Sequence, residues 1–464
     1  MLHLKTTDNT ESKLFSLCAL NNFQPGESSA FQQDEISLAH RDLLGIANVP
    51  LNELVSQNKN LLVFPQSIDK SYGRIDELSI LEMYGGADNL KDVKIKTGNL
   101  MGFIGTGGTQ LQITSRFADS EKDSFLHYML SKVFSINLFK LDFNASSGRF
   151  FDILIFLFPY FLKKALDQGI FKTYRTFDRN DSNVKGAVDV SRHIKSNIPF
   201  AGKISYRERR QTFDNPLTEL VRHTIEFIKA KPLGASVLSS DLQTKSAVNQ
   251  IIEVTGSYNF HERSRIIFQN AKPARHPYFC EWAPLQKICL AILSHKNNSY
   301  HHDKSKVHGL LFDGAWLWEE YLATILTPLG FSHPRNKEHS GGIRMFENEK
   351  DELDIDRNFR RIYPDFYKKG GMILDAKYKN LQNGVCREDL YQVVSYMHTT
   401  KISKGGFIFP AGGGADFNNL NYKLAGYGGT LSVTGMKIPQ GKMQAEEFRA
   451  RMEAEEEKFR NRFL

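Results

Sequence analysis

The sequence is poor in cysteine and tryptophan, and it has no long apolar run. Its four cysteines are far apart and form no CxxC pair, which argues against a disulfide framework or a zinc site. They are Cys18, Cys280, Cys289 and Cys386. The polar start of the chain lacks the pattern of a signal peptide. The most apolar segment, residues 150–162, is too short to cross a bilayer and is interrupted by Asp152 and Pro159. We therefore expect a cytoplasmic protein with reduced, mostly buried thiols and no membrane segment.

Glycine-rich segments are present, but none has the sequence of a phosphate-binding loop. GTGG at residues 105–108 is followed by no Lys-Ser or Lys-Thr pair, so it is predicted to be a hairpin turn. GGG at residues 412–414 is predicted to be a loop for the same reason. His-His-Asp at residues 301–303 lies among Asn, Ser and Lys, which is typical of a loop rather than a metal site. The chain is therefore not expected to hydrolyse a nucleotide itself.

Composition and charge are those of a globular protein with a modest basic excess. At 464 residues, two or three domains are the natural expectation. The hydrophobic share of 41% gives ample material for a core. The net charge of +8 is spread along the chain, so it favours a polyanionic partner only weakly.

Periodicity divides the chain into a strand-rich beginning and a helical middle. NLLVFP at residues 60–65 and the segments on both sides of GTGG are predicted strands. After residue 121, apolar residues recur at spacings of three and four, which predicts helices. One helix is predicted to start at Pro216, with Asp214 or Asn215 as its N-cap.

The C-terminal third predicts a different layout. Residues 310–331 are predicted to form a helix, FRRIYPDFY and GMILDAKYK two strands, EDLYQVVSYMHTTK a helix, and residues 405–411 a further strand. This helix–strand–strand–helix–strand order is the minimal layout of a restriction-type nuclease core. The final helix carries Phe448, Met452, Phe459 and Phe463 on one stripe, which indicates packing on its own domain or, alternatively, on a partner.

Together these patterns predict an α/β (α+β multidomain) protein with four segments. They are a β-rich N-terminal domain (residues 1–120), a mostly helical middle region (121–300), a domain with a restriction-endonuclease-like mixed sheet flanked by helices (301–440), and a charged C-terminal helix (441–464).

The most informative motif is YPDF followed by DAKYK. On a strand, alternate residues share a face, so Asp375 and Lys377 point the same way. The turn sequence KKGG lets Asp365 reach the same place from the preceding strand. Two close carboxylates repel each other, and a divalent cation relieves that repulsion. Oxygen ligands without His or Cys favour Mg²⁺, with Mn²⁺ as the alternative to it. The competing interpretation is a surface ion pair across a hairpin.

An acidic residue on the preceding helix is expected to complete the site. WLWEEYL offers Glu319 and Glu320, of which one can face inward while the other faces water. We favour Glu319 as the third metal ligand, with Glu320 as its close competitor. A bound metal would polarise a phosphodiester and activate water, and Lys377 would help position that water.

Further polar residues follow the motif. Gln392 and Tyr396 are spaced i, i+4 and share one helical face, where Gln392 could hold a metal-bound water and Tyr396 could contact phosphate. Tyr378 and Lys379 are predicted to face the DNA backbone. A polar pair packed on a helix is the alternative for Gln392 and Tyr396.

These motifs resemble the McrC family, the endonuclease subunits of McrBC-type (LlaJI-like) restriction systems in the PD-(D/E)xK superfamily. The resemblance rests on YPDF, DAKYK, YQVVSY and WLWEEYL, and also on KGAVDVSRHI and YRERRQTFDNPLTELVRHT in the middle region. It covers most of residues 95–400.

The resemblance implies a Mg²⁺-dependent endonuclease that acts on double-stranded DNA in antiphage defence. DNA with 5-methylcytosine, DNA with another modification and a plain sequence are the alternative targets. The resemblance implies catalytic roles for Asp365, Asp375 and Lys377. It also implies a McrB-like AAA+ GTPase partner that forms a hexameric ring and binds the GTP. In this family the β-rich N-terminal part is expected to enter the ring as a stalk. A non-catalytic DNA-binding adaptor that activates the GTPase, and a stand-alone DNA repair nuclease, are the alternatives.

Overall fold

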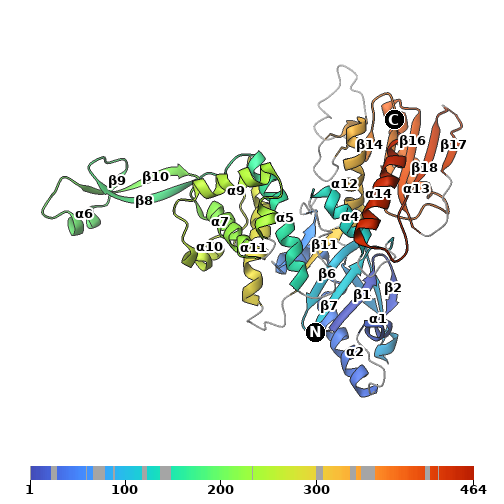
Figure 1. Cartoon of the computed structure of the whole chain (residues 1–464), viewed down its shortest axis with the longest axis horizontal. Helices are drawn as coiled ribbons and strands as arrows, with labels where there is room; N and C mark the ends of the chain where they lie inside the picture. The colour runs from blue at the N-terminus through green and yellow to red at the C-terminus, as the bar shows by residue number, and fades with distance from the viewer. Residues whose placement is uncertain are drawn as a thin grey trace, which may run out of the picture. The chain divides into compact units, whose positions relative to one another are not determined.

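The computed structural model has a mixed α/β fold with several sheets (Figure 1). The structure describes residues 2–21, 29–58, 60–65, 79–86, 89–117, 123–135, 148–231, 234–298, 307–334, 341–345, 361–412, 419–426 and 428–463. Two compact units result: residues 1–144 with 303–464, and residues 145–302.

A five-stranded sheet forms the first half of the larger unit. Its strands lie in the order β1 (Leu2–Thr7), β7 (Thr109–Thr114), β6 (Leu100–Thr106), β11 (His308–Asp313) and β3 (Leu61–Phe64). β6 and β7 form the predicted hairpin, and its turn needs glycine because Gly107 has a φ of +60°. A Cβ on Gly107 would also meet the carboxylate of Asp42 at 2.5 Å. That carboxylate accepts the N–H of Gly108, which ties α2 (Ser29–Leu44) to the turn.

β11 corrects one prediction. Residues 310–313, predicted as the start of a helix, belong to this strand, which pairs parallel with β3 and antiparallel with β6. The apolar run Gly309–Phe312 suits a central strand because it is buried on both faces. The helix α12 (Gly314–Leu326) begins one residue later, where Asp313 caps it by accepting the N–H of Ala315.

Helices and a small sheet complete the core of this half. The small sheet has the order β2 (Glu11–Lys13), β5 (Lys94–Thr97) and β4 (Leu81–Tyr84). The helices are α1 (Leu14–Asn21), α2, α3 (Leu51–Gln57) and α4 (Ser124–Val133). Leu4, Leu14, Ile36 and Ile104 are among the buried residues of the shared core.

The second sheet of the larger unit carries the predicted motif. Its order is β14 (Phe366–Tyr367), β15 (Ile373–Ala376), β16 (Lys404–Ala411), β18 (Thr430–Lys437) and β17 (Leu420–Lys423). β15, β16 and β18 are parallel, and α13 (Arg387–Thr400) packs on β15 and β16 through Val393 and Met397. β12 (Ile343–Arg344) and β13 (Arg361–Ile362) form a separate two-stranded ladder. The predicted order of helices and strands is therefore confirmed for α12, β14, β15, α13 and β16.

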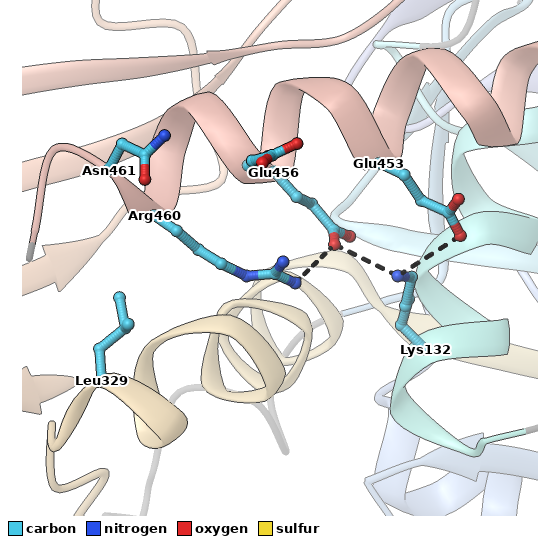
Figure 2. Close-up of a pocket in the computed structure, with 7 residues that line it drawn as sticks. Lys132, Leu329, Glu453, Glu456, Arg460 and Asn461 are labelled. Atoms are coloured by element: carbon cyan, nitrogen blue, oxygen red, sulfur yellow. Dashed lines mark hydrogen bonds and ion pairs between the residues drawn. The ribbon is translucent and has the colours of Figure 1, made fainter.

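The C-terminal helix α14 (Ala445–Arg460) packs on its own unit, against β18, α12 and α4. Phe448, Met452 and Phe459 are buried, as the apolar stripe predicted. Glu456 is buried on the same face and is held by Lys132 of α4 at 3.2 Å and Arg460 at 3.1 Å (Figure 2). Packing on the own domain is thus the correct alternative for this helix.

The smaller unit contains helices and one long hairpin. Its helices are α5 (Gly148–Asp167), α6 (Val190–Ser196), α7 (Pro216–Lys229), α8 (Gly234–Leu238), α9 (Leu242–Val254), α10 (Arg263–Gln269) and α11 (Trp282–Asn298). β8 (Thr173–Asp181) and β10 (Ile204–Thr212) pair antiparallel, with β9 (Ala187–Val188) at the edge, and extend away from the helices of this unit (Figure 1). Asn215 caps α7 with Pro216 at its first position, as predicted.

Two predictions about thiols and membranes can be compared with the structure. The four cysteines are free, but Cys280 and Cys386 are exposed and only Cys18 and Cys289 are buried. Within the described ranges, none of the helices combines the length and apolar character needed to cross a bilayer. The His-His-Asp cluster at 301–303 lies outside the described residues, as do Gly413 and Gly414.

Candidate active site

A tight hairpin brings the two predicted aspartates to one end of the second sheet. β14 pairs antiparallel with β15, with Phe366 opposite Leu374. The turn passes through Gly370, whose φ of +69° suits glycine. Asp365 directly precedes β14, and Asp375 is the third residue of β15. The hairpin predicted from the sequence is therefore confirmed.

The carboxyl group of Asp365 lies against the strand that carries Asp375. Its Oδ2 accepts a hydrogen bond from the backbone N–H of Ala376 at 2.7 Å. Asp375 itself is 1% exposed, because every residue of β15 is buried. The structure thus brings the two aspartates together on the β14–β15 side of the mixed sheet.

Burial is the main cause that raises the pKa of both carboxyl groups, and neighbouring acids raise both further: Asp375 and Glu319 act on Asp365, and Asp389 acts on Asp375. Burial raises the pKa of Asp365 most, and the charges of Asp375 and Glu319 raise it further, so that it lies well above its usual value. Burial also raises the pKa of Asp375, although the ammonium of Lys377 opposes that change. A carboxyl pair of this kind favours binding of a proton or of a cation.

Lys377 is the cation closest to Asp375. Its Nζ lies 2.7 Å from Oδ2 of Asp375 and 3.4 Å from Oδ1 of Asp389, and it donates to Oε1 of Gln392 at 3.2 Å. Burial alone would lower the pKa of Lys377, but the charges of Asp375, Asp365 and Asp389 outweigh it and raise the pKa. The side chain is therefore a fixed positive charge.

α13 supplies three polar side chains on one face toward this lysine. Gln392 donates through Nε2 to the hydroxyl of Tyr396 at 2.8 Å. Burial, and then the charges of Asp375 and Asp365, raise the pKa of Tyr396 to about 12, although the hydrogen bond from Gln392 opposes the rise. The structure therefore places Gln392 and Tyr396 beside the acidic pair.

Sequence reasoning missed Asp389, which is the third of these side chains. Asp389 is nearly buried and pairs with Lys379 at 2.6 Å as well as with Lys377. It precedes Gln392 by three residues, and a spacing of 3 and then 4 up to Tyr396 places all three on one helical face. This spacing could have identified Asp389 as a site residue from the sequence.

The two glutamates of α12 have different neighbours. The charge of Glu319 acts on Asp365 and raises the pKa of that carboxyl. Oε1 of Glu320 instead lies 3.9 Å from Nε2 of His333. The Nδ1–H of His333 donates to the backbone carbonyl of Asp365 at 2.7 Å, and its ring stacks on Phe366 at 4.7 Å.

His333 was also missed, and nothing in its neighbourhood in the sequence marks it. Burial alone would lower its pKa, but the hydrogen bonds to Glu320 and to the carbonyl of Asp365 raise the pKa above the usual 6.5. His333 therefore connects Glu320 to the backbone of Asp365, and Glu319 is the glutamate whose charge acts on Asp365.

The prediction that Tyr378 faces DNA is corrected. Its side chain is 5% exposed and turns away from Lys377 because neighbouring residues of an extended segment alternate in direction. Its hydroxyl lies 2.7 Å from Oγ of Ser115, in the first sheet. Lys379 is exposed, and its contact with Asp389 leaves it at the surface next to the site.

The donor atoms fit a hard cation in part. Oδ2 of Asp375 is buried, and none of the described residues gives it a well-directed hydrogen bond, although Lys377 is near. Across the described ranges, no three acidic, His or Cys side chains converge closely enough to form a complete ligand set. Mg²⁺ commonly uses one or two protein carboxylates together with water and substrate phosphate. Asp365 and Asp375 match that pattern, whereas Glu319 is not placed in a common ligand set with them.

Comparison with known proteins supplies the family. The family model described as "McrBC 5-methylcytosine restriction system component" matches residues 95–410. No curated protein matches the chain.

Two solved structures from Thermococcus gammatolerans are similar at low identity. One is a refined half-complex from a tetradecameric assembly of McrB AAA+ hexamers with bound McrC, at 15% identity and a TM-score of 0.44, covering 97% of this chain and 99% of that chain. The other is a cryo-EM structure of the McrBC complex, at 14% identity and a TM-score of 0.28, covering 70% of this chain and 87% of that chain. The family match spans well over half of the chain, so the membership predicted from the sequence is confirmed: the chain belongs to the McrBC family of 5-methylcytosine restriction system components.

Proposed function

We propose that this chain is the McrC-like nuclease subunit of a GTP-dependent restriction system and hydrolyses phosphodiester bonds of double-stranded DNA with Mg²⁺. The observation that carries the proposal is the pair of the partly buried Asp365 and the buried Asp375 beside Lys377, with the pKa of both carboxyl groups raised. Membership of the McrBC family supports the same reaction.

The roles follow from the geometry. Asp365 and Asp375 would hold the cation, and when bound it would polarise the phosphodiester and activate water. Lys377, with its fixed positive charge, is placed to orient that water and to offset negative charge that develops on the phosphate. Gln392 bridges Lys377 and Tyr396 and would keep both side chains directed toward the substrate.

Because the pKa of Asp365 is raised, a proton competes with the cation for its carboxyl group. In the metal-free chain its carboxyl group retains a proton to higher pH than an ordinary aspartate. Cation binding must displace that proton, so binding releases protons and strengthens as the pH rises.

We propose a McrB-like AAA+ GTPase as partner. The half-complex from Thermococcus gammatolerans contains McrB AAA+ hexamers with bound McrC, and no phosphate-binding loop is present in this sequence. In this proposal the partner binds GTP and this chain cuts. The family description points to DNA that contains 5-methylcytosine as the target.

A non-catalytic, DNA-binding activator of the GTPase is the second candidate. It is favoured by one observation, which is that no three ligand side chains converge in the described part of the chain. The Asp365–Asp375–Lys377 arrangement favours the nuclease.

A cleavage assay decides between the nuclease and the activator. It contains methylated plasmid, this chain, its GTPase partner, GTP and Mg²⁺. We expect cutting by the wild-type complex and none by Asp375→Asn, with GTPase stimulation retained in both. Asp92→Asn, an exposed aspartate paired with Lys13, is the matched control and should cut normally. GTPase stimulation without cutting by the wild-type complex would support the activator instead.

A further inference from the structure

The segment that follows Lys377 is attached to the first sheet. Tyr378 lies beyond β15, yet its hydroxyl is 2.7 Å from Oγ of Ser115, and its ring meets Phe117 edge-on at 5.1 Å. The guanidinium of Arg116 lies 4.9 Å from the centre of the same ring. Three consecutive residues that follow β7 therefore surround one side chain next to the candidate catalytic lysine.

The backbone of this segment is held from two sides. The N–H of Lys377 donates to the carbonyl of Ile408 in β16 at 2.8 Å. The carbonyl of Tyr378 accepts from Nη2 of Arg116 at 2.7 Å. One end of this two-residue unit is thus fixed by the second sheet and the other by the first.

Arg116 is itself held in place by the first sheet. Its backbone N–H donates to Oδ1 of Asp8 at 2.6 Å, and its Nε lies 3.4 Å from Oδ2 of that residue. Nη2 also donates to Oδ1 of Asn99 at 3.1 Å. Asp8 is fully buried, so the carboxylate side of this ion pair is shielded from solvent.

The start of α12 leaves the space that the tyrosine needs. A Cβ on Gly314 would lie 2.6 Å from the ring of Tyr378, so a larger residue there would displace it. The N–H of Gly314 donates to the carbonyl of Asn99 at 2.8 Å. Gly314 begins α12, so Tyr378 packs against the start of this helix. The same helix carries Glu319, whose charge raises the pKa of Asp365.

We propose that Arg116 and Tyr378 are positioning residues for Lys377, so that the first sheet is part of the framework of the active site. This inference rests on the proposed nuclease function for its effect on rate, but the placement of Lys377 can be measured without cleavage. Lys377 must reach Asp375, Asp389 and Gln392 at once, and a shift of its backbone would break that arrangement. A misplacement of about 1 Å can lower a rate by about 100-fold.

The test combines amide hydrogen exchange and kinetics on the full chain. In Arg116→Ala we expect the amides of residues 377–379 to exchange at least about tenfold faster than in the wild type. In the complex with GTPase, GTP and Mg²⁺ we expect kcat of this variant to fall by about 100-fold, while the KM for methylated plasmid changes by less than about threefold.

Tyr378→Phe keeps the ring and loses the hydroxyl contact, so we expect kcat to fall less, by about tenfold. Arg449→Ala, an exposed arginine of α14, is the matched control and should change neither quantity.

The outcomes separate this inference from the proposed function. Unchanged exchange at residues 377–379 in Arg116→Ala would overturn it, as would a fall in kcat equalled by the control. Faster exchange confined to this segment would support it even if the wild-type complex never cut DNA, a result that would overturn only the proposed function. If Arg116→Ala does not fold, Tyr378→Phe and Ser115→Ala decide, because each removes the same hydroxyl contact and both should accelerate exchange at residue 377.

Discussion

Two buried carboxylates in the larger unit, Glu456 and Asp375, are each 1% exposed and each lie beside a lysine. Glu456 accepts hydrogen bonds from the hydroxyls of Tyr128 at 2.7 Å and Tyr321 at 2.9 Å. It also accepts hydrogen bonds from Lys132 and Arg460, which Figure 2 shows. Asp375 has Lys377, but its Oδ2 receives no well-directed hydrogen bond from the described residues, and its other neighbour is a second acid.

The difference distinguishes a structural carboxylate from one that is available to a ligand. A buried charge is tolerated when hydrogen bonds and opposite charges satisfy it, and Glu456 meets that condition. Asp375 is buried and Asp365 is partly buried, and the two carboxylates repel each other, which costs stability unless a proton or a cation is bound. The first site stabilises the packing of α14, and the second is the one that we propose binds a cation.

The largest expected effect is on cleavage. Asp375→Asn and Lys377→Ala should each lower the rate of plasmid cutting by the complex by at least about 100-fold, because each removes a group from the reacting centre. Single-turnover cleavage measures this. Glu456→Gln should cut at the wild-type rate at temperatures where it is folded, and a comparable loss in that variant would remove the distinction between the two sites.

The second effect is on stability, and it is expected at Glu456 rather than at the aspartate pair. Glu456→Ala should lower the free energy of unfolding by about 3 kcal/mol, because it leaves Lys132 and two buried hydroxyls without their acceptor. Urea denaturation measures this loss. Glu457→Ala, its exposed neighbour on α14, should change it by less than about 0.5 kcal/mol. Equal losses in the two variants would contradict a structural role for Glu456.

The third effect is the pH dependence of stability that comes from Asp365. The folded-state pKa of Asp365 is raised, so its protonated form contributes stability that is complete below the ordinary value of 3.8 and is lost as the pH rises through the folded-state value. The metal-free Asp365→Asn variant should therefore become progressively more stable than the wild type as the pH rises. Thermal unfolding between pH 4 and 8 with a chelator measures this, and a constant difference would argue against a raised pKa.

The smallest effect is expected at the rim of the site. Gln392→Ala should lower kcat by about tenfold, because Gln392 links Lys377 to Tyr396 without contacting either aspartate directly. Gln250→Ala, an exposed glutamine of α9, serves as the control. A loss as large as that of Asp375→Asn would show that Gln392 has a more direct role than positioning.

The central hairpin could be predicted because its signals are local. Alternation places Asp375 and Lys377 on one face, and the turn sequence between β14 and β15 returns Asp365 to the same edge. The stripe of α14 was equally readable from its spacing. These features depend on residues that are close in the sequence.

The remaining features depend on partners that are distant in the sequence. The second half of β11 was predicted to be helical because its apolar run continues into α12. Only the pairing of β11 with β3 and β6 shows that it is a strand. Tyr378 was predicted to face DNA because nothing near it in the sequence indicates burial. Its contacts are with Ser115 and Arg116, which lie more than 250 residues earlier in the chain. The burial of Glu456 also depends on distant partners, since its donors Tyr128 and Tyr321 lie on α4 and α12.

The most direct test is the position of a bound cation. A crystal of the full chain soaked in Mn²⁺ would give an anomalous difference peak wherever the ion binds. We predict a peak between the carboxylates of Asp365 and Asp375 and none at Glu456. A peak at Glu456, or no peak at the aspartate pair at saturating Mn²⁺ and pH 8, would contradict the assignment of Asp365, Asp375 and Lys377 as the cutting site.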